Sequence, residues 1–276
     1  MTNGWLDVIK EAIKLPALLK DIYGDLLKPG VKQLGKALET VLGLGNTILL
    51  PLTLLNEKAR ITLQLNLEKY REQLQDVPEE SIALVPPEIG IPIVEKLTYV
   101  SDDELSALYV NLLAKASTVN TNDLAHPGFV NVINCLCPDE VIFLRQLYKR
   151  DPLPFVSASL FDKKVGSLFQ PIGDLLTGVE KEISLLFPDN AQAYISNFEG
   201  LGLIHVRRDI YLDHQPFYDA LEKLYRPQYE SLPFDKKKKK LEFKKGKIDV
   251  TPYGSMFMEA CLSGLLKEIH EINVKE

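Results

Sequence analysis

IPIVEKLTYVSDDELSALYVNLLAKASTVNTNDLAHPGFVNVINCLCPDE, residues 91–140, is the stretch that decides the fold. Its start and stop signals predict a helix, a loop and two further helices. Ser101 is a good N-cap, and Glu104 three residues later completes a capping box. Pro138 suits the first position of the next helix. Apolar side chains recur three or four residues apart, as one helix face requires, at Leu105, Leu108, Leu112 and Ala116.

Five short motifs follow one another along this stretch. They are I-P-I-V at 91–94, a tyrosine with an acidic cap at 99–104, L-x-x-L-x-x-N-L-L-A at 105–114, H-P-G-F at 126–129 and P-D-E at 138–140. Their order and spacing resemble the abortive-infection alpha (Abi-alpha) family, bacterial proteins associated with phage defence. The resemblance is strongest over residues 30–140 and continues toward the C-terminus. It implies a role in phage defence and points to no catalytic residue.

Composition indicates a globular protein, because 46% of the 276 residues are hydrophobic and 25% are charged. The net charge of −6 argues against a general nucleic-acid binder but hides an asymmetry. Residues 236–247 hold eight lysines and one glutamate, a net charge of +7, which leaves −13 for the rest. Three cysteines, an odd and sparse set, favour a reducing compartment, and the N-terminus does not read as a secretory signal. We therefore expect a cytoplasmic protein, able to lie at the inner membrane.

The N-terminal region combines an amphipathic segment at 3–23 with an uncharged stretch at 40–56. As a helix, the stretch at 40–56 would span roughly 26 Å, slightly less than a bilayer core of about 30 Å. Glycine and proline interrupt the stretch, which argues against a simple membrane anchor. Two readings stay open, a buried hairpin and a segment that enters a membrane when triggered. The candidate membrane- or partner-binding residues are Trp5, Leu44, Ile48, Leu49, Leu50 and Leu52.

The remaining patterns predict a mainly α fold. We expect helices over 53–76, 141–150, 171–187, 189–201 and 252–272, a short strand or turn at 155–162, a strand at 204–212 and a β-hairpin within 241–254 that turns at Lys245-Gly246. This outline resembles a winged helix. The predicted parts are amphipathic and apolar helices at 1–80, a central helical core at 81–137 and a small α+β, winged-helix-like module with a basic hairpin at 138–276.

Catalytic and metal-binding motifs are not evident. The sequence has no phosphate-binding loop, no nucleophile elbow and no H-E-x-x-H. His126 reads as a helix cap or, with Asp123, as a weak catalytic candidate. His205, Asp209, Asp213 and His214 form either a metal site or an ion-paired strand edge with Arg207 and Arg208. Cys135 and Cys137 read as buried or half-buried structural thiols. We expect no enzymatic activity, cofactor or metal.

The lysine run is the strongest electrostatic feature. Its candidate anion-binding residues are Lys236, Lys237, Lys238, Lys239, Lys240, Lys244, Lys245 and Lys247. They suit a solvated hairpin, a wing on nucleic-acid phosphates, or attraction to an anionic membrane or acidic partner. The segment 189–201 contains no lysine or arginine, which argues against sequence-specific DNA reading. The leading hypothesis is a non-enzymatic phage-defence protein that binds a protein partner or a phage component, is able to form an oligomer, and acts further by conditional membrane insertion of 40–56. The alternative is a nucleic-acid-binding regulator.

Overall fold

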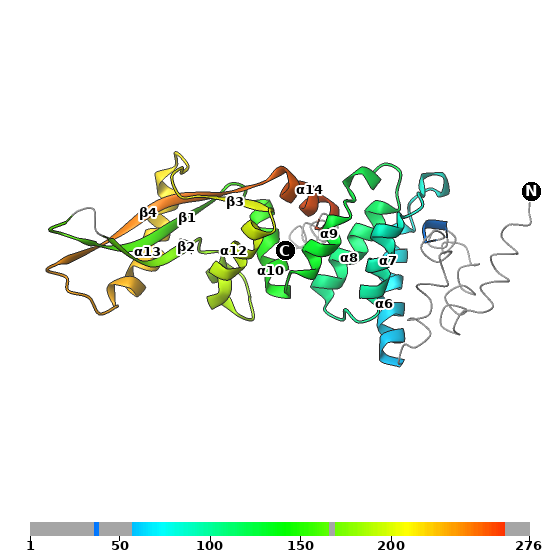
Figure 1. The fold of residues 1–276 in the computed structure, drawn as a ribbon, viewed down its shortest axis with the longest axis horizontal. Helices are drawn as coiled ribbons and strands as arrows, with labels where there is room; N and C mark the ends of the chain where they lie inside the picture. Colours follow the sequence, from blue (N-terminus) through cyan, green and yellow to red (C-terminus); the bar gives the residue numbers. More distant parts are fainter. Residues whose placement is uncertain (1–35, 39–56, 166–168, 263–276) are drawn as a thin grey trace, which may run out of the picture. The chain divides into compact units, whose positions relative to one another are not determined.

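The computed structural model describes residues 36–38, 57–165 and 169–262 (Figure 1). The amphipathic segment at 3–23, the apolar stretch at 40–56 and its candidate residues lie outside these ranges. The chain divides into two compact units, which are treated separately below. Unit 1 comprises residues up to Pro138 together with those from Glu259 onward, and unit 2 is Asp139–Met258.

Unit 1 is helical in its described part. Its elements are α6 (Glu57–Leu74), the short turn η1 (Glu79–Ser81), α7 (Pro87–Leu97), α8 (Asp103–Ala116), η2 (Asn122–Leu124) and α9 (Gly128–Asn134). Helix α8 packs against α6, α7 and α9. The helix predicted over 53–76 is confirmed by α6 over 57–74, while 53–56 lie outside the described residues, and the capped central helix is confirmed by α8. The N-cap of α8 is Asp102 rather than Ser101, because the Asp102 carboxylate accepts the backbone N–H of Leu105 at 3.0 Å.

Unit 2 is built on a four-stranded antiparallel sheet. Its strands are β1 (Leu153–Asp162), β2 (Phe169–Leu176), β3 (Ile204–Arg207) and β4 (Lys239–Val250), in the order β2-β1-β4-β3. Its helices are α10 (Pro138–Lys149), α11 (Val179–Glu182), α12 (Ala191–Gly200) and α13 (Gln215–Glu230), with the turn η3 (Pro188–Asn190). A last helix, α14 (Pro252–Cys261), begins in unit 2 and ends in unit 1. Figure 1 shows β1, β2 and β4 extending side by side.

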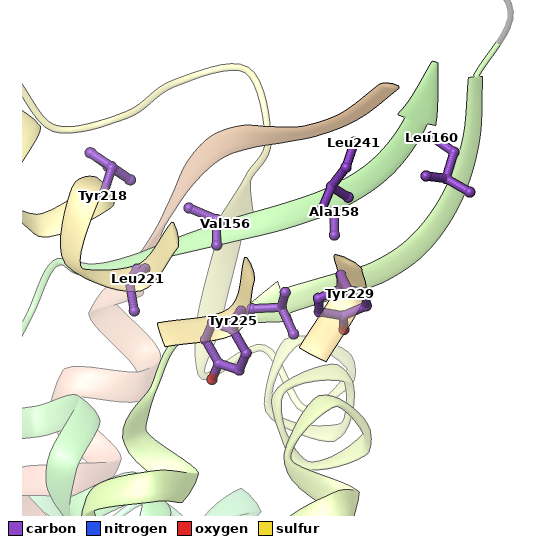
Figure 2. Packing of buried hydrophobic residues seen from close by; sticks show 9 residues of the cluster. Val156, Ala158, Leu160, Tyr218, Leu221, Tyr225, Tyr229 and Leu241 are labelled. Atoms are coloured by element: carbon purple, nitrogen blue, oxygen red, sulfur yellow. The ribbon is translucent and has the colours of Figure 1, made fainter. Parts of the chain in front are cut away.

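Helix α13 covers one face of this sheet. Its buried side chains Tyr218, Leu221, Tyr225 and Tyr229 are spaced three or four residues apart, so they form one stripe. The sheet meets them with alternate residues of two neighbouring strands, Val156, Ala158 and Leu160 from β1 and Leu241 from β4 (Figure 2). Because side chains alternate along a strand, the intervening residues point to the opposite face.

Several predictions for the C-terminal part are wrong. The predicted helix at 171–187 is replaced by β2 and the short α11, and the strand at 204–212 ends at Arg207. The strand reading of 155–162 is confirmed by β1. The helix predicted at 252–272 is confirmed over its first ten residues by α14, and 263–272 lie outside the described residues. Helix α13 has no counterpart among the predictions. Helices prevail as predicted, but the winged-helix arrangement is not confirmed.

The predicted hairpin is a single continuous strand. Lys245-Gly246 lies in the middle of β4 and pairs with Val156 and Phe155 of β1. Gly246 is required there by close packing, since a Cβ at this position would lie 2.6 Å from the carbonyl oxygen of Arg207 and would overlap the Phe155 ring. The glycine therefore marks a close approach between neighbouring strands rather than a turn.

Candidate anion-binding site

Two loops are joined at one end of the sheet of unit 2. The first follows β1, and the second precedes β4. The backbone N–H of Lys163 donates to the carbonyl of Lys238 at 2.8 Å. The side-chain ammonium of Lys163 donates to the carbonyl of Lys236 at 2.7 Å. These bonds extend the β1–β4 pairing beyond Asp162, which lies opposite Lys239. The lysine-rich loop is therefore fixed to the end of β1.

Two aspartates order the backbone of these loops. The Asp235 carboxylate accepts the N–H of Lys237 at 2.9 Å, and its carbonyl accepts the N–H of Lys239 at 2.8 Å. Asp162 accepts the N–H groups of Lys164 and Val165, at 2.7 and 3.1 Å. Those two hydrogen bonds, with the nearby lysines, hold the pKa of Asp162 below its usual range. The lysines thus project from tight turns with defined backbone geometry.

The sheet face opposite α13 continues this basic surface. Phe161 lies opposite both Lys240 and Phe169 in the pairing register, so the three side chains share that face. The two phenyl rings stack with their centroids 5.5 Å apart. The Lys244 ammonium lies 4.3 Å from the centroid of the Phe169 ring and 5.2 Å from that of Phe161. Cation–π attraction favours this placement of the charge beside both rings.

Lysines outnumber acids in this region. Eight lysines and three acids make up this region, which we call the basic end. They are Lys163, Lys164, Lys236, Lys237, Lys238, Lys239, Lys240, Lys244, Asp162, Asp235 and Glu242. Its net charge is +5, which leaves −11 for the rest of a chain that carries −6. Lys238 pairs with Asp235 at 3.6 Å and Lys240 with Glu242 at 3.1 Å. Such exposed pairs are weak, so the end stays strongly positive.

Two large apolar side chains accompany these lysines. Val165 follows the Lys163-Lys164 pair and is 53% exposed, and Phe169 opens β2 and is 49% exposed. Each leaves about half of its surface in water, although burial would be favourable for both. Positive charge and exposed apolar surface therefore coincide at one end of the sheet.

Six of the eight lysines predicted from the sequence belong to the basic end, and two do not. The Lys245 ammonium lies 5.3 Å from the Tyr218 ring on the α13 side of the sheet and hydrogen-bonds to Gln215. Lys247 forms an ion pair with Asp249 at 2.8 Å. In their place the structure adds Lys163 and Lys164. The sequence shows these two as an adjacent pair, but only the pairing of β1 with β4 places them beside the lysine run.

An ion pair crosses the sheet near Lys244. Asp174 of β2 accepts hydrogen bonds from the Ser157 hydroxyl at 2.5 Å and from the guanidinium of Arg208, which follows β3, at 2.9 Å. Burial raises the pKa of Asp174, but these two bonds outweigh it, so the pKa lies below its usual range. Ser157 pairs with Lys244 across β1 and β4. A fixed, charged cluster therefore borders the basic end.

The metal site considered for 205–214 is not formed. Among the described residues no three His, Cys, Asp or Glu side chains are arranged to hold an ion. The predicted ion pairing of the two arginines occurs, but with other acids, since Arg207 lies 3.8 Å from Asp249 and Arg208 pairs with Asp174. Strand β3 ends at Arg207, so the later residues do not share its face.

His126 has the capping role expected of it. Its Nδ1 accepts the backbone N–H of Gly128 at 3.0 Å, at the start of α9. Of the cysteines, Cys261 is buried, and burial raises its pKa well above the usual value. Cys137 is half-buried, as predicted, whereas Cys135 is exposed, which corrects the prediction of a buried or half-buried thiol there.

The acids of the P-D-E motif anchor other parts of unit 2. The buried Asp139 carboxylate accepts the backbone N–H groups of Leu186 and Phe187, at 2.9 and 2.8 Å, and the Tyr194 hydroxyl at 3.0 Å. Burial raises the pKa of Asp139, but the three hydrogen bonds outweigh it and lower the pKa below its usual range. Glu140 accepts the side-chain amide of Asn197 of α12 at 2.8 Å. The motif is therefore structural.

Fold and site define a protein with a helical unit followed by an α+β unit that ends in a basic surface. The family model described as "Abortive infection alpha" matches residues 62–261. The chain belongs to the abortive infection alpha family, which confirms the resemblance seen in the motifs of residues 91–140.

Comparison with other proteins adds little more. A solved structure, of an uncharacterized protein from the marine bacterium Alcanivorax borkumensis, is similar at 15% identity over 51% of this chain and 94% of that chain, with a TM-score of 0.29. No curated protein matches. In the part of the chain that the structure describes, no helix is both long enough and apolar enough to cross a bilayer.

Proposed function

We propose that this protein serves abortive infection by binding rather than by catalysis, and that the basic end is the surface that takes an anionic partner. The observation that carries the proposal is the concentration of eight lysines, with a net charge of +5, at one end of an otherwise acidic chain. Such a charge distribution raises the local concentration of an anionic partner and speeds its association.

The hydrogen-bonded framework of the basic end supports this role. Lys163 ties its two loops together, and Asp235 orders the turn that carries Lys236 to Lys239. A preorganised set of charges loses less conformational entropy on binding than a flexible run would. Exposed lysines that only kept the protein soluble would not require this framework.

We further propose that the defence response reaches the inner membrane. The uncharged stretch at 40–56 would enter the bilayer after a trigger, as its composition suggests. A liposome-leakage assay with wild type and Leu49→Asp tests this step, since a charge within the inserted stretch is costly. Under activating conditions leakage by the wild type alone is expected, whereas no leakage, or equal leakage by both proteins, rules out insertion of this stretch.

Nucleic acid is a second candidate partner. The observation that favours it is the grouping of Lys244 with the Phe161 and Phe169 rings, because single-stranded nucleic acids bind surfaces that combine cations with aromatic side chains. Under this alternative the protein would act as a regulator that binds nucleic acid.

Charge reversal tests the role of the basic end. Lys236→Glu, Lys237→Glu and Lys238→Glu are combined in one variant, and Lys149→Glu, Lys181→Glu and Lys223→Glu in the control. All six lysines are exposed, and both variants change the net charge equally. We expect the first variant to lose phage protection in a plating assay and to leave a sulfonated cation-exchange column at lower salt than the control. Equal behaviour of the two variants would refute the proposal.

A further inference from the structure

Resting on the proposed function, we infer that the anionic partner of the basic end is a phospholipid surface. The lysines meet the headgroups, and Val165 and Phe169 enter the boundary between headgroups and acyl chains. This surface is distinct from the apolar stretch at 40–56, so it can attach the protein before any insertion of that stretch.

The kind of cation favours lipid. All eight basic residues of the basic end are lysines, and none is arginine. Arginine is the side chain that recognises a guanine edge or a single phosphate with two parallel hydrogen bonds. A lysine ammonium is a point charge on a flexible stem, which suits the diffuse negative potential of an anionic leaflet.

The exposed apolar side chains also favour lipid. Val165 has no planar surface on which a base could stack, yet it is 53% exposed beside two lysines. A membrane interface takes up aliphatic and aromatic side chains alike, while neighbouring lysines keep their ammonium groups among the headgroups. Nucleic acid would leave Val165 without a role.

The phenyl rings are already engaged. Phe161 and Phe169 stack on each other, and the Lys244 ammonium lies 4.3 Å from the Phe169 ring centroid. A base that stacked on Phe169 from that side would have to displace the ammonium. At a bilayer the same arrangement needs no change, because Lys244 can contact a phosphate while the ring edge points inward.

The test measures binding of the full-length protein to vesicles of phosphatidylglycerol and phosphatidylcholine in equal parts, and to phosphatidylcholine alone. We expect binding only to the anionic vesicles. Combining Lys236→Glu, Lys237→Glu and Lys238→Glu should weaken it at least about 100-fold. The control with Lys149→Glu, Lys181→Glu and Lys223→Glu should bind nearly as the wild type does, because its lysines lie outside the basic end.

Insertion is measured separately. Val165→Ser with Phe169→Ser should weaken binding about tenfold. This loss should persist at high salt, where the contribution of the lysines is screened. In a protein with Trp5→Phe and Phe169→Trp, the new indole should be quenched by acyl-brominated lipid. Circular dichroism checks that each variant is folded, as expected for exposed positions.

The outcomes separate the two proposals. If the protein binds a single-stranded thymidine oligonucleotide but not anionic vesicles, the lipid inference is wrong. If the variant with Lys236, Lys237 and Lys238 replaced by glutamate then loses oligonucleotide binding, the basic end remains the binding surface. Vesicle binding without quenching of the indole likewise refutes insertion of Phe169. If the basic-end and control variants bind vesicles and oligonucleotide equally, both proposals fail.

Discussion

Asn111 donates its side-chain amide to the carbonyl oxygen of Cys261 at 2.6 Å, a contact between residues 150 positions apart in the sequence. Asn111 belongs to the L-x-x-L-x-x-N-L-L-A motif of α8, and Cys261 is the last residue of α14. The side-chain carbonyl of Asn111 in turn accepts the amide of Gln73 of α6 at 2.5 Å. The motif asparagine therefore links Gln73 of α6 to the last residue of α14 through two hydrogen bonds.

Replacing Asn111 by alanine should destabilise unit 1. The side chain is buried, so its loss leaves the Cys261 carbonyl without this donor. We expect the free energy of unfolding to fall by about 2–3 kcal/mol, measured by urea denaturation. Gln73→Ala is the control, because it removes a hydrogen bond whose donor is exposed and should cost about 1 kcal/mol or less. Equal losses for the two variants would contradict the role given to Asn111.

Asp139 should make stability depend on pH on the acid side. Its pKa is lower in the folded protein than in the unfolded chain, so the ionised form stabilises the fold above the unfolded pKa of about 3.9. That stabilisation is lost as the pH falls below this value and through the folded pKa. The Asp139→Asn variant should be less stable by about 1–3 kcal/mol near neutral pH, since an amide cannot accept all three bonds equally well.

The pH dependence predicted for Asp139 is checked by urea unfolding at a series of pH values from about 6 down to 2. The difference between wild type and Asp139→Asn should shrink as the pH falls. Asp103 serves as a matched carboxylate, because its pKa is also lowered, by Lys69, but its side chain is exposed. Asp103→Asn should have a small effect at every pH. A constant difference between wild type and Asp139→Asn across the series would show that ionisation of Asp139 is not the cause.

Gly246 should not tolerate a side chain. An alanine Cβ would meet the Arg207 carbonyl oxygen, a backbone atom that can move only if β3 shifts. We expect Gly246→Ala to lower the midpoint of thermal unfolding, at a cost of about 1–3 kcal/mol. Gly200→Ala is the control, since a Cβ there meets nothing within 4 Å and alanine favours the end of α12. If Gly246→Ala is as stable as the wild type, the close approach of Gly246 to the Arg207 backbone is refuted.

The same glycine shows why part of the fold could be predicted and part could not. Helices α6, α8 and α10 follow from local signals, namely caps, first-turn acids and apolar periodicity. Gly246 follows Lys245 and so resembles a turn, but its role depends on Arg207 from another strand. Local sequence carries no record of that neighbour.

Strand β2 illustrates a second limit. Ile172, Leu175 and Leu176 are spaced as on a helix face, which favours a helix over 171–187. The structure pairs this segment with β1 through two register shifts, on either side of Ala158, so the alternation expected of a strand is interrupted. Tertiary pairing thus overrode the local pattern.

The candidate site was predicted in the same partial way. A run of lysines is visible in any sequence, and six of those in the basic end were expected. Their common surface depends on the pairing of Phe161 with Lys240 and of Asp162 with Lys239, across more than 70 residues of chain. For the same reason the sequence alone could not show that Lys245 and Lys247 lie on the other face of the sheet from Lys244, because that assignment needs the strand register.

That register gives a direct test of the site. Lys240→Gln with Lys244→Gln removes two positive charges from the face opposite α13, and Lys245→Gln with Lys247→Gln removes the same number from the same strand. At about 1 kcal/mol for each lysine near an anionic surface, the first pair should weaken binding to phosphatidylglycerol vesicles about 30-fold. The second pair should change it far less, because Lys245 contacts Tyr218 and Lys247 is neutralised by Asp249. Vesicle co-sedimentation at low salt measures both. Equal weakening would mean that net charge alone controls binding, and that the basic end is not a defined site.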